Sequence, residues 1–175
     1  RTIAEAIRRR TLEETGLVVS VGVAPNKFVA KIASDLEKPD ALVVFEESGL
    51  SERLASLPIE RMWGIGPRSL PRFKQAGLNV FGDLQSSDPD WLAERFGSSA
   101  RRFHALAHGR DDRAVVPERE AKSIGQERTF SEDVADPDTV EGILLGEVEQ
   151  VAERLRRSGS LARTVTLKIR FGDFQ

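Results

Sequence analysis

The sequence predicts an α+β protein of several small domains, and three observations support this prediction. Residues 1–46 alternate helical patterns with short apolar runs, as at one edge of an α/β sheet. Residues 47–110 contain helical patterns separated by glycine, proline and Ser-Asp, without a strand pattern. Residues 122–175 place a long amphipathic helix between two strand-like segments. We therefore expect a partial α/β unit, an all-α helix-hairpin-helix unit and a partial β-α-β unit.

The first unit is predicted from two helices and two apolar runs. Residues 2–15 have helical spacing and end at Gly16, and a second helix opens at Asn26. The runs Leu17–Val23 and Ala41–Phe45 are typical of buried strands. One side of the first helix is apolar, with Ile3, Ile7 and Leu12. This order of elements predicts one edge of a sheet whose other strands come from elsewhere in the protein.

Both ends of the sequence have the pattern expected of a fragment. The chain opens on Arg1 inside a helical pattern and closes on Gln175 directly after a strand-like run. A sheet needs more than two strands to be stable by itself. We therefore expect the remaining strands upstream of Arg1, and we interpret the sequence as a fragment of a longer protein.

The second unit is organised around the stretch Leu57–Leu78, which predicts a helix, a glycine turn and a second helix. Pro67 suits the first turn of that second helix, and Gly64 and Gly66 let the backbone approach a ligand closely. Unpaired amides at a helix start, near the positive end of its dipole, form a phosphate-sized site. Basic residues follow the turn: Arg68, Arg72 and Lys74. The pattern is typical of a helix-hairpin-helix that binds one nucleic-acid strand, while the alternative is an ordinary αα-hairpin.

The rest of the second unit is predicted to be helical and to end in a linker. Residues 79–84 form a short connection, and Asp88 with Pro89 caps the helix that follows. A last helix begins after Gly97 and ends at Gly109. Residues 111–121 are charged and lack periodicity, so we expect a linker between domains.

The third unit is predicted from a long helix at Pro137–Arg157 and the segments Ser123–Phe130 and Arg163–Phe171. The last segment alternates strictly, so its apolar residues should pack on the helix: Val165, Leu167, Ile169 and Phe171. Its other face is polar and basic, with Thr164, Thr166, Lys168 and Arg170. Lys168 and Arg170 are candidate contacts to DNA phosphates, although a merely solvated face would have the same pattern.

Composition narrows the possible functions. The formal net charge is −2, so any binding of nucleic acid must come from local patches. The chain has no cysteine and no apolar run long enough for a membrane helix, and we expect a cytoplasmic protein without a membrane partner. His104 and His108 have helical spacing but no third ligand near them in sequence, so we expect no metal site. Nucleophile-elbow, Walker and dinucleotide-binding motifs are absent.

Three lysines form a second informative pattern. Lys27 and Lys31 lie one turn apart on the helix after the first apolar run, and Lys38 stands at the break before the second. Lysines beside a strand–helix junction are a common way to bind a polyphosphate. The pattern is also compatible with ordinary surface lysines.

Four blocks of sequence together resemble the Y-family DNA polymerases, in the DinB or DNA polymerase IV branch. They are SVGVAPNKFVAKIASDLEKPDALVVF at 20–45, LPIERMWGIGPRSLPRFKQAGL at 57–78, RFGSSARRFHALAHGRDDRAV at 95–115 and KSIGQERTF at 122–130. The resemblance implies the C-terminal part of a palm at 1–46, a complete thumb at 47–110, a linker at 111–121 and the first half of a little finger at 122–175.

The resemblance also implies binding residues. Lys38 and Lys31 match palm lysines at the triphosphate of the incoming dNTP. DNA contacts are implied for Gly64, Ile65, Gly66, Lys122, Ser123 and Gly125. Trp63 stands where the family usually has a small residue or proline, so the packing of the turn should differ.

The family's catalytic carboxylates, which bind two Mg²⁺ ions, would lie upstream of Arg1. We therefore expect no catalytic residue and no metal ligand in these residues, and no nucleotide incorporation by them alone. The implied partners are primer–template DNA, dNTP and a sliding clamp bound through a region beyond Gln175. The implied activity of the whole protein is translesion DNA synthesis.

Three other interpretations remain. A non-catalytic relative that serves DNA repair would keep the fold, although Lys31 and Lys38 argue against it. A helix-hairpin-helix scaffold protein would leave the blocks at 20–45 and 122–130 unexplained. A generic α/β metabolic domain would not explain the hairpin.

Overall fold

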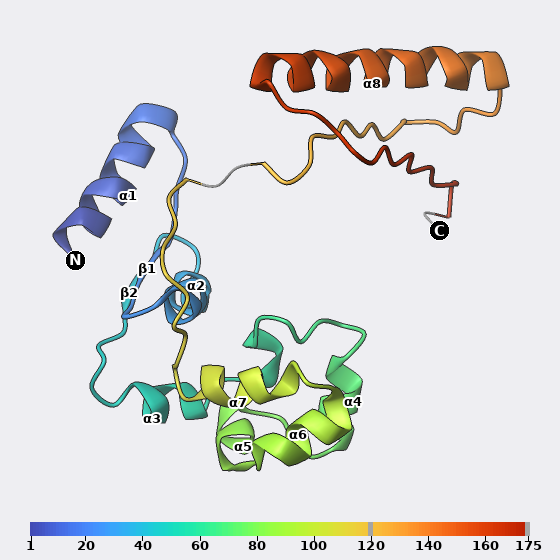
Figure 1. Cartoon of the computed structure of the whole chain (residues 1–175). Helices are drawn as coiled ribbons and strands as arrows, with labels where there is room; N and C mark the ends of the chain where they lie inside the picture. Colours follow the sequence, from blue (N-terminus) through green and yellow to red (C-terminus); the bar gives the residue numbers. More distant parts are fainter. Residues whose placement is uncertain (119–120, 174–175) are drawn as a thin grey trace. The chain divides into compact units, whose positions relative to one another are not determined.

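The computed structural model describes residues 1–118 and 121–173 (Figure 1). It divides into two compact units, Arg1–Val115 (unit 1) and Val116–Gln175 (unit 2). The division falls within residues 111–121, where we predicted a linker. The finer boundaries predicted within unit 1 stay a prediction.

Unit 1 begins with a strand–helix–strand arrangement preceded by a helix. The elements are α1 (Thr2–Thr15), β1 (Val21–Val23), α2 (Lys27–Leu36) and β2 (Leu42–Val44). The two strands pair in parallel, with Val21 opposite Leu42, as a helical connection between them requires. Gly16 ends α1 in the left-handed conformation, at φ 70°. The Asn26 side chain caps α2 by accepting from the Val29 amide at 3.1 Å.

The strands are shorter than predicted, and the apolar side of α1 is exposed. Leu17 and Val18 precede β1 and are 63% and 55% exposed. Ile3 is 78% exposed, and α1 buries only Ala4. A strand is defined by its hydrogen-bonded partner, and β2 offers β1 only three residues. The apolar pattern was therefore detected correctly, but no described element covers it.

The all-α prediction for residues 47–110 is confirmed apart from an isolated bridge between Pro58 and Val80. The helices are α3 (Leu50–Ala55), the 3₁₀ turn η1 (Ile59–Arg61), α4 (Leu70–Gln75), α5 (Phe81–Ser86), α6 (Pro89–Phe96) and α7 (Ala100–Ala107). The predicted connection at residues 79–84 was wrong, because α5 occupies most of it. The Asp83 carboxylate accepts from the amides of Asn79 and Val80 at 2.7 and 2.9 Å and so starts this helix.

The helix after the glycine turn also differs from the prediction. It begins at Leu70, with Pro71 in its first turn, and Pro67 lies in the turn before it. The element before the turn is the 3₁₀ segment η1, not an α-helix. Proline is compatible with either position, so the sequence did not distinguish them.

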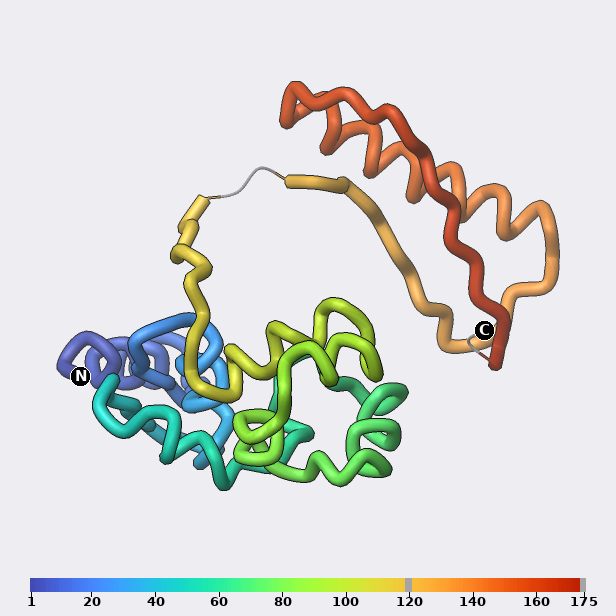
Figure 2. Tube along the Cα trace, turned by 60° about the horizontal axis from the view of Figure 1, so that its bottom comes forward, coloured from blue at the N-terminus to red at the C-terminus, as the bar shows by residue number. Residues whose placement is uncertain are grey.

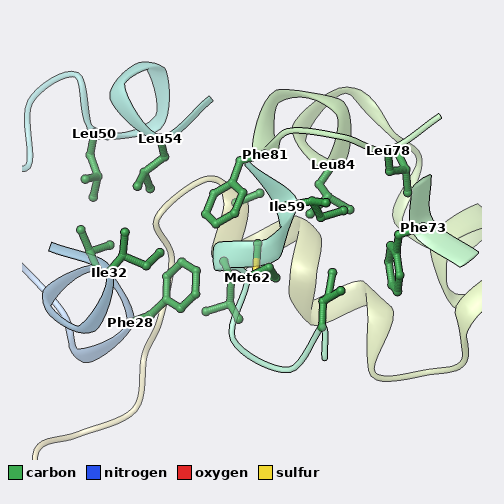
Figure 3. Packing of buried hydrophobic residues seen from close by; sticks show 14 of the residues in the cluster. Phe28, Ile32, Leu50, Leu54, Ile59, Met62, Phe73, Leu78, Phe81 and Leu84 are labelled. Atoms are coloured by element: carbon green, nitrogen blue, oxygen red, sulfur yellow. The ribbon is translucent and has the colours of Figure 1, made fainter. Parts of the chain in front are cut away.

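One hydrophobic core runs through unit 1, from α2 to the helices around the glycine turn (Figure 3). The rings of Phe28 and Phe81 stack with centroids 6.2 Å apart, and those of Phe73 and Phe96 at 4.0 Å. Figure 3 shows Phe28 between Ile32 of α2 and Met62, which follows η1. Because the core is continuous, the α/β elements and the helical elements are held together as one unit.

Gly22 marks the closest approach of β1 to α2. A Cβ atom at this position would lie 2.2 Å from the Ala30 carbonyl oxygen and 2.4 Å from the Ser34 amide nitrogen. Both are backbone atoms, so no side-chain rotation can relieve the clash. Only glycine allows the helix to pack so near the strand.

Unit 2 consists of the long helix α8 (Pro137–Ser158) and extended segments that lie along it (Figure 2). The helix was predicted correctly. The Asp136 carboxylate caps it by accepting from the Thr139 amide at 2.9 Å, and Gly159 ends it at φ 63°.

The two predicted strands of unit 2 are absent among the described residues 121–173. The apolar side of 163–171 does not pack on α8 as expected, since Val165 is 93% and Phe171 is 76% exposed. Polar contacts connect the segments instead: Lys168 pairs with Glu127 at 2.7 Å, and Arg128 with Glu147 at 3.1 Å. Alternation shows that a segment has two different faces, but a strand also needs a hydrogen-bonding neighbour.

No helix among residues 1–118 and 121–173 is long and apolar enough to cross a membrane.

We expect Gly22→Ala to destabilise unit 1 by about 3 kcal/mol or more, because it drives a methyl group into the backbone of α2. Gly66→Ala is the matched control, since a Cβ atom there meets nothing within 4 Å. Urea unfolding followed by far-UV circular dichroism measures both. Equal stability of G22A and G66A would contradict the close packing of β1 on α2.

Candidate nucleic-acid and nucleotide interface

The glycine turn is exposed and requires glycine at one position. Gly64 has φ 108°, a region that side-chain-bearing residues rarely adopt, and a Cβ atom there would lie 3.1 Å from the Phe103 ring. Gly66 is exposed, and space around it is open. The two glycines therefore differ: Gly64 maintains the turn, whereas Gly66 leaves the backbone accessible.

The backbone amides of the turn are only partly available to a ligand. Ile65 donates to the Met62 carbonyl at 2.9 Å, and Gly66 donates to the Ser69 hydroxyl at 3.1 Å. Within the described part of the chain, the amides of Gly64 and Arg68 have no hydrogen-bond partner. Ile65 itself is buried, at 6% exposure. A phosphate would meet two open amides here, and a contact from the Ile65 amide would compete with its existing hydrogen bond.

The basic residues that follow the turn also differ in whether their charged groups already have a partner. Lys74 forms an ion pair with Glu60, which lowers the pKa of that carboxyl. Arg72 donates to the Arg95 carbonyl at 2.9 Å. Arg68 is exposed, and its guanidinium makes no ion pair or hydrogen bond with any described residue. Arg68 is therefore the cation best able to meet a phosphate at this turn.

The two lysines predicted to bind a triphosphate meet at one carboxylate. Lys31 and Lys38 each form an ion pair with Asp35, one on each carboxylate oxygen. Hydrogen bonds from the two ammonium groups, Lys31 first, lower the pKa of Asp35 to about 2. Both lysines are more than half exposed, at 60% and 58%. The structure thus brings the lysines together, and sequence reasoning missed the carboxylate that does so, although its i+4 spacing from Lys31 was visible.

The predicted DNA contacts in unit 2 are exposed. Lys122 and Ser123 lie in the extended segment before α8. The Gly125 carbonyl accepts from Arg154 at 3.0 Å. Lys168 is paired with Glu127, whose pKa it lowers, and Arg170 adds to this lowering more weakly.

The histidine pair has structural contacts. His108 accepts from or donates to the Ser51 hydroxyl at 3.0 Å through Nδ1, and its ring lies 4.8 Å from that of His104. Burial lowers the pKa of His108. Residues 1–118 and 121–173 contain no group of three or more His, Asp or Glu able to hold a metal ion.

Sequence reasoning also missed a contact between the turn and the residues after α7. The Arg113 guanidinium lies over the Trp63 ring, 4.9 Å from its centroid. Arg113 is held by two hydrogen bonds to Asp111, at 2.6 and 2.8 Å. No local pattern joins positions 50 residues apart, so only the fold shows this contact.

Comparison with models of protein families shows to which family the chain belongs. Two models of the impB/mucB/samB family match it, the family model over residues 1–35 and the model of its C-terminal domain over residues 121–175. The chain belongs to this family. The resemblance of this impB/mucB/samB family member to Y-family DNA polymerases of the DinB branch is confirmed, and similar curated proteins are DNA polymerases IV.

DNA polymerase IV of Methanoculleus marisnigri is 46% identical over 173 residues, which are 99% of this chain and 48% of that protein. DNA polymerase IV of Alkalilimnicola ehrlichii is 43% identical over 99% of this chain and 49% of its own length. The crystal structure of DinB from Sulfolobus solfataricus matches with a TM-score of 0.56 and 32% identity, over 62% of this chain and 32% of that one. This impB/mucB/samB chain therefore spans about half the length of the curated relatives it matches.

We expect the pKa of Asp35, measured by NMR titration of its carboxyl carbon, to rise from about 2 towards 3.8 in K31M/K38M. Its pKa is lowered on folding, so its contribution to stability is present above pH ~4 and is lost as the pH falls towards ~2. The double variant should therefore lose this part of the acid dependence.

Lys27→Met is the control, because Lys27 donates to the Ala114 carbonyl at 2.6 Å and not to Asp35. An unchanged titration midpoint in K31M/K38M would contradict the ion pairs.

Proposed function

We propose that this chain is part of a translesion DNA-directed DNA polymerase and that it binds primer–template DNA and the triphosphate of the incoming dNTP. The observation that carries the proposal is the alignment of 99% of the chain with proteins named DNA polymerase IV, at up to 46% identity. The chemistry of the two exposed clusters supports it, since each presents cations or open amides suited to phosphate.

In this proposal residues 1–46 belong to a palm, residues 47–110 to a thumb and residues 122–175 to a little finger. The turn Gly64-Ile65-Gly66 would contact the backbone of one DNA strand, with Arg68 as its cation. The open backbone at Gly66 and the two unpaired amides support this role. The turn would position the substrate and perform no chemistry.

Lys31 and Lys38 would bind the triphosphate. Their pairing with Asp35 keeps both ammonium groups in one place without ligand. A triphosphate carries more charge than one carboxylate, so it can compete for these lysines, and exposed ion pairs of this kind are weak. Binding would then exchange one anion for another.

In unit 2 the proposed contacts to the DNA backbone are Lys122, Ser123, Gly125, Lys168 and Arg170. Lys122 and Ser123 are exposed in extended chain. Lys168 would have to leave Glu127, which is itself 75% exposed, so the exchange costs little.

The remaining parts of the proposal concern the whole protein. Divalent metal, by resemblance Mg²⁺, would be bound by catalytic carboxylates upstream of Arg1. A sliding clamp would bind through a region beyond Gln175. The proposed location is the cytoplasm, where the chromosome of a cell without a nucleus is copied.

We expect the chain to bind fluorescent primer–template DNA with an affinity that falls as salt rises. Gly66→Ala should weaken binding severalfold, because its Cβ atom is harmless in the free protein but obstructs the approach of a phosphate. Arg68→Gln should weaken binding and reduce the slope of log affinity against log salt by about 1. Fluorescence anisotropy at several salt concentrations measures all three.

Arg101→Gln is the matched control, since it removes the same charge from an exposed arginine that already pairs with Asp90 at 2.7 Å. If R68Q and R101Q have equal salt slopes, or if G66A binds as the unchanged protein does, the turn is not the phosphate contact.

A further inference from the structure

Trp63 is exposed in a part of the chain whose other apolar residues are buried. Its neighbours Met62 and Ile65 are 1% and 6% exposed, whereas Trp63 is 60% exposed. Burying a tryptophan would contribute substantially to stability, and the core beside it is well packed. The exposure of so large an apolar side chain next to the glycine turn needs an explanation.

The ring is held in place from one side. The Arg113 guanidinium lies over it at 4.9 Å from the centroid. Arg113 in turn makes two hydrogen bonds to Asp111, whose side chain is only 2% exposed. Asp111 also accepts from the Phe28 amide at 3.2 Å. The buried Asp111 carboxylate therefore holds Arg113 in place, and Arg113 covers one face of the Trp63 ring.

The charge of Arg113 is already neutralised. Its hydrogen bonds lower the pKa of Asp111, and those same bonds raise the pKa of Arg113. Arg102 lies 3.8 Å from the same carboxylate. Because both guanidinium bonds go to Asp111, Arg113 serves the ring as a cation–π partner more than it serves as a free phosphate ligand.

We propose that Trp63, supported by Arg113, is a stacking surface for an unpaired nucleobase of the DNA strand bound at the turn. A held aromatic ring with one open face loses little entropy on stacking, and every base offers a π-face to it. The ring is adjacent in sequence to Gly64, whose amide is open. The inference rests on the proposed binding of DNA and adds a contact to a base, where the turn itself contacts only the backbone.

The test uses Trp91→Phe as background, so that Trp63 is the single tryptophan. An oligothymidylate of about 12 nucleotides should quench the Trp63 fluorescence in a saturable manner. Anisotropy of the labelled strand should show that Trp63→Ala, on the natural background, binds about fivefold or more weakly, whereas Trp63→Phe retains most of the affinity. The salt slope of W63A should stay unchanged, because no phosphate contact is lost.

An oligonucleotide of the same length with abasic sites separates stacking from backbone binding. W63A and the unchanged protein should bind it equally. Equal affinity of W63A and the unchanged protein for the thymidylate strand, or an equal loss on the abasic strand, would overturn the stacking role. If no form of the protein binds any strand at low salt, the proposed DNA binding fails and the stacking role fails with it. Circular dichroism melting confirms that W63A is folded, as expected for an exposed side chain.

Discussion

The N-terminus of α2 is the point on which the structure of unit 1 depends. The side-chain oxygen of Asn26 caps this helix, and the side-chain nitrogen of Asn26 donates to the Gly109 carbonyl at 2.7 Å. The next two residues bind the same distant segment, Lys27 through Ala114 and Phe28 through Asp111. The fully buried Phe28 ring then connects α2 to Phe81 among the helices. One helix end therefore joins the sheet, the helical region and the chain that leaves unit 1.

This arrangement determines the candidate sites. Lys31 and Asp35 lie on the exposed side of the helix whose other side forms the core, so their spacing is set by a rigid element. The glycine turn belongs to the same core through Met62 and Ile65. Asp111 links the two regions, because it binds the Phe28 amide and orients Arg113 over Trp63. The predicted nucleotide lysines and the predicted DNA turn are thus parts of one packed unit.

Several lysines of the candidate sites are paired with carboxylates before any ligand binds. Lys31 and Lys38 share Asp35, Lys74 has Glu60, and Lys168 has Glu127. A chain with a net charge of −2 can therefore still present cations to an anion, because exposed pairs cost little to exchange. Near the turn, the Arg68 guanidinium makes no ion pair or hydrogen bond with any described residue, so it needs no exchange. The salt dependence of binding depends most directly on such residues.

The sequence by itself determined the family and most of the helices, but it missed α5 and did not distinguish η1 from an α-helix. Asn26, Asp88 and Asp136 act within three residues of their own position, so local pattern suffices to predict the helix starts they cap. Tertiary structure alone decided which apolar runs become strands, since Arg163–Phe171 alternates strictly yet has no ladder partner among the described residues. It also decided that Arg113 covers the ring of Trp63, 50 residues away in the sequence. Pairing, burial and ion pairs between distant residues depend on how the chain packs, and periodicity along the chain carries no information about that.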